Sequence, residues 1–146
     1  MPKLYFMDTG VRNIIVNDLN PLEGRRDSSS LVENSVFLMF LTMNALLEEI
    51  YYWRTKAGAE MDFILKGEGE NLRGYEVKYR PFKKAKITRS TRSFINEYSP
   101  AITYICTRNF YQDKLDMDLI GFSGLNDKSR LVFQPAFFLS RNFPAL

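Results

Sequence analysis

Histidine is missing from this sequence of 146 residues, and cysteine occurs once, as Cys106. Because histidine is the commonest general base and a frequent zinc ligand, its absence excludes Ser-His-Asp and Cys-His catalysis, histidine-dependent nuclease mechanisms and an ordinary zinc site. A single cysteine cannot form an internal disulfide framework. We therefore expect Cys106 to be a small core residue and the protein to be cytoplasmic.

The sequence also lacks a phosphate-binding loop, a membrane span and a signal peptide. No Gly-x-x-x-x-Gly-Lys-Ser/Thr motif is present, so the chain carries no recognisable nucleotide site. Its longest apolar run, near residues 36–47, is interrupted by Thr42 and Asn44 and is too short to cross a bilayer. The first residues lack the charged start and apolar stretch of a signal peptide. We expect no membrane partner.

Hydrophobic periodicity predicts an α/β fold with a mixed central sheet flanked by helices. A short strand at 3–8, a weak helix or turn to residue 16 and a polar loop at 17–30 precede the order helix, three antiparallel strands, helix, strand. Those six elements are predicted at residues 31–49, 50–54, 60–66, 73–79, 84–98 and 101–107. The first of these helices is apolar nearly all round and should be buried at the centre.

The length suits one domain over residues 1–146, in which residues 108–146 form a weakly predicted C-terminal extension. A last edge strand is expected at 133–139, where Pro135 interrupts the pattern. The strand at 3–8 begins directly after Met1-Pro2, which is compatible with a piece cut from a longer protein and equally with a natural edge strand.

Charged residues interrupt two of the predicted strands. Asp62 lies in the second strand, and Glu76 and Lys78 lie in the third. Side chains two residues apart in a strand share a face, so Glu76 lies beside Lys78, and Glu60 beside Asp62. A carboxylate in an apolar strand needs a compensating cation, partner charge or water. Pairing of the two strands is expected to gather Asp62, Glu76 and Lys78 in one patch.

Glu33 has two interpretations. Ser30-Leu31-Val32-Glu33 has the spacing of a capping box, in which the glutamate bonds the amide of the N-cap residue. The same carboxylate near the start of a central helix is also a candidate ligand for a metal site. Local sequence leaves both open.

Basic residues are concentrated between positions 78 and 92, which we call the basic segment. The net charge is −4 over residues 1–77, +7 over 78–92 and 0 over the remainder. The segment contains no acid between its basic residues, which are Lys78, Arg80, Lys83, Lys84, Lys86, Arg89 and Arg92. Such a run suits neutralisation of phosphates, so the six residues after Lys78 are predicted to bind nucleic acid. The alternative is a solvated helix face.

Several motifs together resemble a known family. They are Lys-Leu-Tyr-Phe-Met-Asp-Thr-Gly at 3–10, Leu-Val-Glu-Asn at 31–34, Tyr-Trp-Arg-Thr at 52–55, Gly-Ala-Glu-Met-Asp-Phe at 58–63 and Glu-Val-Lys at 76–78. The combination resembles domain of unknown function 4143, the C-terminal domain of a family of prokaryotic AAA-type ATPases. The order of elements and the acids also resemble the PD-(D/E)xK, or restriction-endonuclease-like, superfamily. The resemblance covers about residues 3–107 and implies an upstream P-loop ATPase in a longer protein.

The nuclease resemblance implies a particular site. Asp62, Glu76 and the carbonyl of Val77 would bind Mg²⁺ or Mn²⁺, Glu33 would complete the site directly or through water, and Lys78 would hold the attacking water or the scissile phosphate. Glu60 would be a reserve ligand or would pair with a neighbouring Arg or Lys.

Two functions stay open from the sequence. The first is a Mg²⁺-dependent phosphodiesterase acting on DNA. The second is a catalytically inactive module that binds nucleic acid or protein and regulates the attached ATPase. In that second case Lys78 neutralises Glu76 and Asp62 in a structural cluster. The oligomeric state is not determined by the sequence.

Overall fold

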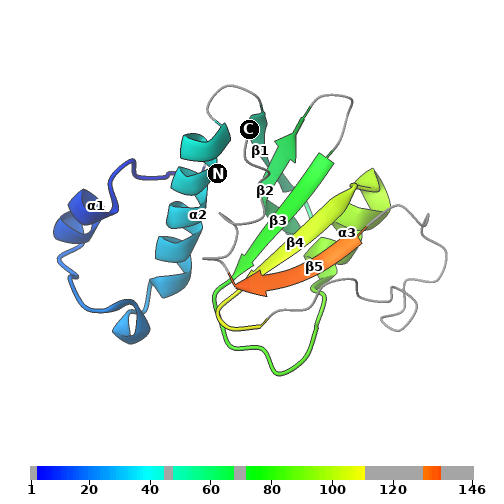
Figure 1. Ribbon diagram of the computed structural model, residues 1–146. Coiled ribbons are helices and arrows are strands. Elements are labelled where there is room, and N and C mark those ends of the chain that lie inside the picture. The colour runs from blue at the N-terminus through cyan, green and yellow to red at the C-terminus, as the bar shows by residue number, and fades with distance from the viewer. Residues whose placement is uncertain (1–2, 45–47, 68–71, 111–129, 136–146) are drawn as a thin grey trace.

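A computed structural model describes residues 3–44, 48–67, 72–110 and 130–135. The elements, in chain order, are α1 (Thr9–Ile15), the 3-10 turn η1 (Leu22–Gly24), α2 (Ser28–Asn44), β1 (Glu49–Arg54), β2 (Glu60–Lys66), β3 (Leu72–Lys78), α3 (Arg89–Tyr98), β4 (Ile102–Thr107) and β5 (Arg130–Pro135) (Figure 1). The strands form one sheet in the order β1-β2-β3-β4-β5. The first three are antiparallel, while β3, β4 and β5 run parallel, so the predicted mixed α/β fold is confirmed.

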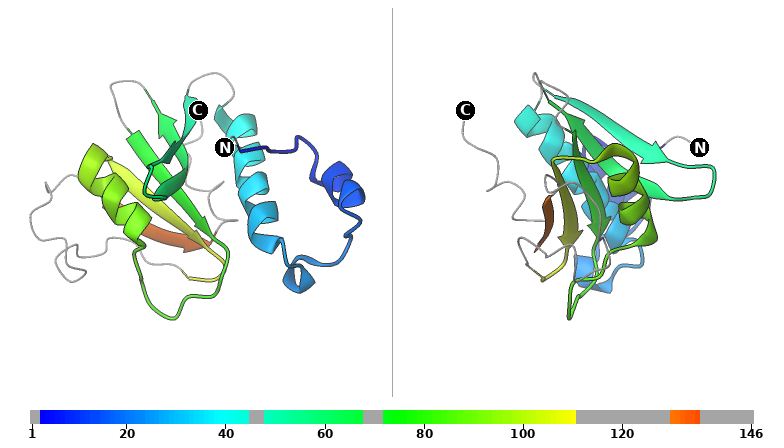
Figure 2. Two further views of the ribbon diagram at one scale, coloured as in Figure 1. Left: turned by 180° about the vertical axis from the view of Figure 1, so that it is seen from behind. Right: turned by 90° about the vertical axis from the view of Figure 1, so that its right-hand side faces the viewer.

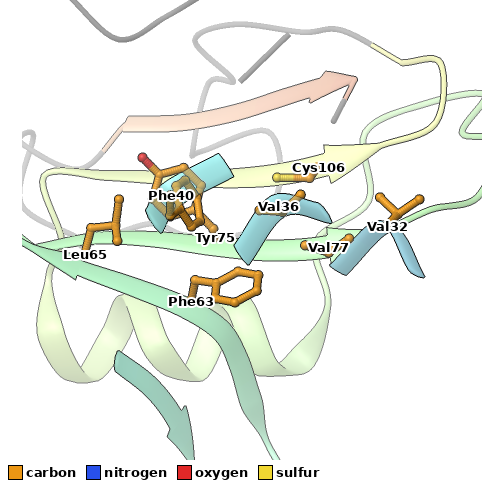
Figure 3. Packing of buried hydrophobic residues seen from close by; sticks show 8 residues of the cluster. All are labelled: Val32, Val36, Phe40, Phe63, Leu65, Tyr75, Val77 and Cys106. Atoms are coloured by element: carbon orange, nitrogen blue, oxygen red, sulfur yellow. The ribbon is translucent and has the colours of Figure 1, made fainter. Parts of the chain in front are cut away.

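Helices α2 and α3 cover opposite faces of the sheet (Figure 2). Apolar residues four apart along α2 form the contact with its face, as expected for an amphipathic helix. That cluster comprises Val32, Val36, Phe40, Phe63, Leu65, Tyr75, Val77 and Cys106 (Figure 3). On the other face Phe94 of α3 packs against Met61 and Ile64, and Ile95 packs against Ile105. The prediction that Cys106 is a core residue is confirmed, since it is fully buried.

The first predicted strand is wrong. Residues 3–6 have no regular structure and lie outside the sheet. The side-chain amide of Asn34 on α2 replaces a strand partner, because Phe6 N donates to its oxygen at 2.7 Å and its nitrogen donates to Phe6 O at 2.8 Å. The weak helix expected next is confirmed as α1, capped by the carboxylate of Asp8.

Both long helices differ from their predicted bounds. Helix α2 begins at Ser28, so Ser30 lies inside it and the capping-box interpretation of Glu33 is wrong. The helix is also not buried all round, since Ser35 and Thr42 are exposed and the buried residues follow the sheet side. Helix α3 begins at Arg89 rather than residue 84, because Thr88 caps it by accepting a hydrogen bond from Thr91 N.

The predicted C-terminal strand is present at the edge of the sheet that the described strands form, but it lies earlier than predicted. Strand β5 pairs with β4 from Ile102–Arg130 to Thr107–Pro135, so Pro135 ends the strand instead of interrupting it. The rest of the segment predicted at 133–139 lies outside the described residues.

A β-bulge in β2 changes the direction of one acid. Tyr51 pairs with Ile64 and Trp53 with Met61, so Asp62 and Phe63 both stand opposite Tyr52. Met61 and Ile64 pack on the α3 side, whereas Phe63 packs under α2. The bulge therefore keeps Asp62 and its neighbour Phe63 together on the α2 side.

Gly74→Ala should destabilise the domain by about 1–3 kcal/mol, because overpacking forces core side chains out of their preferred rotamers. The added Cβ would stand 2.6 Å from Cε1 of Phe94, which is 0% exposed. Urea denaturation measures the change. Gly24→Ala is the matched control, because a Cβ there meets no atom within 4 Å. An equal loss in the two variants would contradict the packing explanation.

Candidate functional site

The candidate site lies where β2 and β3 separate. The two strands pair from Lys66–Leu72 to Phe63–Tyr75. Beyond that point the side chain of Asp62 replaces the backbone as the acceptor, because Val77 N donates to Asp62 Oδ2 at 2.8 Å. Asp62 is 5% exposed, so this buried carboxylate needs further partners.

Lys3 supplies the main partner. Its ammonium donates to Asp62 Oδ1 at 2.7 Å and to Glu33 Oε1 at 2.9 Å, and the hydroxyl of Tyr5 donates to the same Glu33 oxygen at 2.7 Å. Glu33 on α2 and Asp62 on β2, which we call the acid pair, are thus joined by one lysine of the N-terminal segment. The acid pair is compensated by the protein itself.

The acid pair shifts the pKa of both N-terminal partners. Burial is the largest effect on Lys3 and lowers its pKa, but the hydrogen bonds and charges of Asp62 and Glu33 together raise it above the ordinary value. Burial and then the hydrogen bond to Glu33 raise the pKa of Tyr5 far above its ordinary range. Both groups therefore keep their protons in the folded protein well into the alkaline range.

Glu76 has a separate set of partners. It is 2% exposed and faces α3, because Gly74, two residues earlier, lies against Phe94. The hydroxyl of Thr88 lies 2.9 Å from both carboxylate oxygens, and the hydroxyl of Thr91 also donates to Glu76. Lys78 Nζ is 3.0 Å away. The start of a helix favours a negative charge, so Glu76 is fully satisfied where it lies.

A hollow of about 310 Å³ at the end of the sheet is lined by the acid pair and by Lys78. We call it the charged hollow. The charged side chains and strand residue that line it are Glu33, Glu60, Asp62, Val77, Lys78 and Arg80. Arg54 lies 4.0 Å from Glu60, at the limit of an ion pair between exposed groups. Glu33, Asp62, Val77 and Lys78 thus share one hollow, while Glu76 does not line it.

The acids predicted to share a metal ion do not all meet at one point, because Glu33 and Asp62 both bond the Lys3 ammonium whereas Glu76 has other partners. Within the part of the chain that the structure describes, no group of three or more acidic or cysteine side chains is placed so that it could hold a metal ion. The acid pair is turned toward Lys3, Glu76 is turned toward α3, and Val77 presents its N–H to Asp62. These residues do not fit a shared three-acid site as they lie. The Mg²⁺ site and the catalytic roles stay predictions.

Residues 79–88 of the basic segment form an irregular connection between β3 and α3, while Lys78 ends β3 and Arg89 and Arg92 lie on α3. Phe82, Ala85 and Ile87 anchor this connection by packing against the core around Ile95 and Ile105. The six predicted nucleic-acid-binding residues are all exposed, and they are Arg80, Lys83, Lys84, Lys86, Arg89 and Arg92. Apolar anchors thus alternate with outward lysines, and the interpretation as a solvated helix face is wrong for Lys83, Lys84 and Lys86.

Sequence reasoning missed four residues of the site: Lys3, Tyr5, Thr88 and Thr91. Lys3 and Tyr5 fell in a predicted strand and received no role, although the negative balance of residues 1–77 called for cations near the acids. Thr88 and Thr91 were placed inside a helix predicted to begin at residue 84. A threonine followed three residues later by another is compatible with a helix start, and this signal could have identified them.

The class of the protein is an α/β domain with charged groups at the open end of a mixed sheet. The model of the family described as a domain of unknown function (DUF4143) matches residues 28–123, which is more than half of the chain. The chain therefore belongs to this family. No curated protein matches the sequence.

One solved structure is similar over much of the chain. It is a chain of the half-complex from a tetradecameric assembly of Thermococcus gammatolerans McrB AAA+ hexamers with bound McrC. The TM-score is 0.49 at 13% identity, over 73% of this chain and 27% of that chain. This chain therefore spans about a quarter of the length of the solved one.

Among the described residues, no helix is long and apolar enough to cross a membrane.

Lys3→Met should destabilise the domain by about 1–3 kcal/mol, because two carboxylates then face each other without their ammonium. Chemical denaturation at pH 7 measures the loss. Adding Asp62→Asn should recover part of it, and the difference from wild type should narrow in acid as a carboxyl takes up a proton. Lys56→Met, at an exposed turn lysine, is the control. Equal effects at the two lysines would contradict a compensating role for Lys3.

Tyr5→Phe should reduce the loss of stability in alkali. The ordinary pKa of tyrosine is 10.0, and in the folded protein the pKa of Tyr5 is raised. The unfolded chain therefore releases this proton first, so the contribution to stability is complete below pH 10 and is lost as pH rises above it. The free energy of unfolding is measured from pH 9 to 11. Its slope against pH should correspond to about one proton fewer released on unfolding in the variant than in the wild type. Superimposable pH profiles would refute this.

Proposed function

We propose that this domain is a nucleic-acid-binding module with a restriction-endonuclease-like sheet that does not cleave its ligand. The observation that carries the proposal is the exposed basic segment beside a charged hollow whose acids already have partners in the protein. Phosphates would be bound by the basic segment, in which Arg80 lies at the edge of the charged hollow.

The form of the basic segment supports binding. Three apolar residues fix an otherwise irregular connection to the core, so the lysines between them are displayed with less freedom than in a loose loop. Arg80 is held in two ways: its N–H donates to Lys78 O at 2.7 Å, and its guanidinium lies 5.1 Å from the centre of the Phe82 ring. A fixed row of positive charge neutralises phosphates without reading base sequence.

The pairing of the acids supports a function without cleavage. Metal-binding carboxylates must be turned toward one common point. Here Lys3 joins the acid pair, and Lys78 with two threonines satisfies Glu76 on the other side of the sheet. Each buried carboxylate thus has a cation beside it, and the fold is complete without an added ion.

The alternative function is a Mg²⁺-dependent DNA phosphodiesterase, and one observation favours it. Glu33, Asp62, Val77 and Lys78 line the same hollow. An ion bound there would compete with the Lys3 ammonium for the acid pair. Cleavage assays decide between the two functions.

The upstream P-loop ATPase and the cytoplasmic location belong to the same proposal, because they rest on the resemblance of the sequence motifs. In a longer protein the module would report nucleic-acid binding to the ATPase. DNA is the proposed ligand, and the regulated ATPase is the proposed partner.

The triple variant Lys83→Glu, Lys84→Glu, Lys86→Glu should weaken binding of DNA to a similar extent for all base sequences. The slope of log Kd against log salt concentration should flatten by about 0.9 for each phosphate that the variant no longer neutralises. Fluorescence anisotropy of a labelled duplex at several salt concentrations measures both. The control triple, Arg26→Glu, Lys56→Glu and Lys66→Glu, has the same charge change at exposed residues outside the segment. Equal effects in the two triples would reject the segment as a binding surface.

The same preparation tests cleavage. Plasmid and single-stranded circular DNA are incubated with Mg²⁺ or Mn²⁺, and the proposal expects both to stay intact. Cleavage that Lys78→Ala abolishes would overturn it in favour of the phosphodiesterase.

A further inference from the structure

A second hollow, of about 250 Å³, lies between α2 and the β1 edge of the sheet. Its lining is mostly aromatic, so we call it the aromatic hollow. The lining side chains that matter here are Tyr5, Phe37, Tyr52, Phe63 and the carboxylate-bearing Asp62. It shares Asp62 with the charged hollow, so the two open on either side of one residue.

The bulge in β2 builds this hollow. Asp62 and Phe63 stand together opposite Tyr52 of the edge strand β1. Tyr5 stacks on Phe37 of α2 with ring centres 4.4 Å apart, and its ring centre is 5.6 Å from that of Phe63. Three rings thus form a wall held by the core, while Tyr52 is 48% exposed at the rim. Among the described strands, β1 pairs only with β2, so the rim lies at an edge of this sheet (Figure 1).

We infer that the aromatic hollow takes one unpaired nucleobase of a single-stranded nucleic acid. Flat aromatic walls stack bases of any type, and a carboxylate accepts hydrogen bonds from the exocyclic amino group of a base. Lys3 bonds Oδ1 of Asp62 and Val77 N bonds Oδ2, and every carboxylate oxygen has two acceptor positions, so one position on each oxygen remains for the ligand.

The position of the aromatic hollow favours a single-stranded nucleic acid over a duplex. The inference rests on the proposed function, because the phosphates beside the stacked base would lie at the cationic end of the charged hollow, near Lys78 and Arg80, where the basic segment begins. In a duplex the bases are stacked inside and cannot enter. The domain should therefore prefer single strands, with Tyr52 closing over the base from the rim.

The test compares a labelled single strand of deoxycytidines with a blunt-ended duplex of equal length, by fluorescence anisotropy on the full chain. Tyr52→Ala should weaken binding of the single strand about 10-fold, as for loss of one stacking partner, and leave binding of the duplex unchanged. Tyr52→Phe should retain wild-type affinity because the ring is kept. Tyr98→Ala, at a tyrosine of similar exposure on α3, is the matched control and should change neither ligand. If Tyr52→Ala fails to fold, Tyr52→Leu replaces it, because leucine keeps apolar bulk without a flat ring.

The outcomes separate the inference from the proposed function. Binding of both DNAs with no effect of Tyr52→Ala would overturn the aromatic hollow as a base site while the basic segment stands. Absence of DNA binding by the wild-type protein would overturn both the base site and the proposed function. An arginine-rich peptide that binds in a Tyr52-dependent way, with no competition from the single strand, would assign the hollow to a peptide side chain instead.

Discussion

The ion pair network of Lys3 is the interaction on which the rest of the structure depends. One ammonium joins Glu33 of α2 to Asp62 of β2, and it comes from a segment that is not part of the sheet. Burying two carboxylates costs several kcal/mol each unless opposite charge compensates them. The ammonium of Lys3 therefore links the N-terminal segment, the long helix and the bulged strand, in addition to the hydrogen bonds between Phe6 and Asn34.

A second constraint places the remaining acid on the other face. Gly74 lets α3 approach β3 so closely that Thr91 reaches Glu76 two residues further along the strand. Glu76 then takes its compensation from Lys78 and two hydroxyls, independently of the acid pair. The Glu-x-Lys spacing is compatible with a catalytic site, but the partners around it decide whether the carboxylate is available.

Binding and catalysis make different demands on the same sheet end. Binding needs exposed positive charge on a fixed support and surfaces complementary to bases, which the basic segment and the aromatic hollow offer. Catalysis with a metal needs carboxylates that converge, whereas here Glu33 and Asp62 meet at Lys3 on one face and Glu76 lies on the other. Fold alone decides neither, because function depends on the site that a fold carries.

Local pattern determined much of the fold, because strand alternation and helix periodicity are properties of neighbouring residues. The antiparallel strands from Glu49 to Lys78, the strand with Cys106 and the concentration of basic charge at residues 78–92 were all predictable from the sequence. The structures of residues 3–6 and 84–88 were not predictable, because each segment contacts residues distant in sequence. Residues 3–6 are held by the side chain of Asn34, and residues 84–88 pack against the core around Ile95. The same holds for the site. The sequence identified Glu33, Asp62, Glu76 and Lys78, but only tertiary structure decided which cation meets which acid, because the bulge and the helix approach set the directions of these side chains.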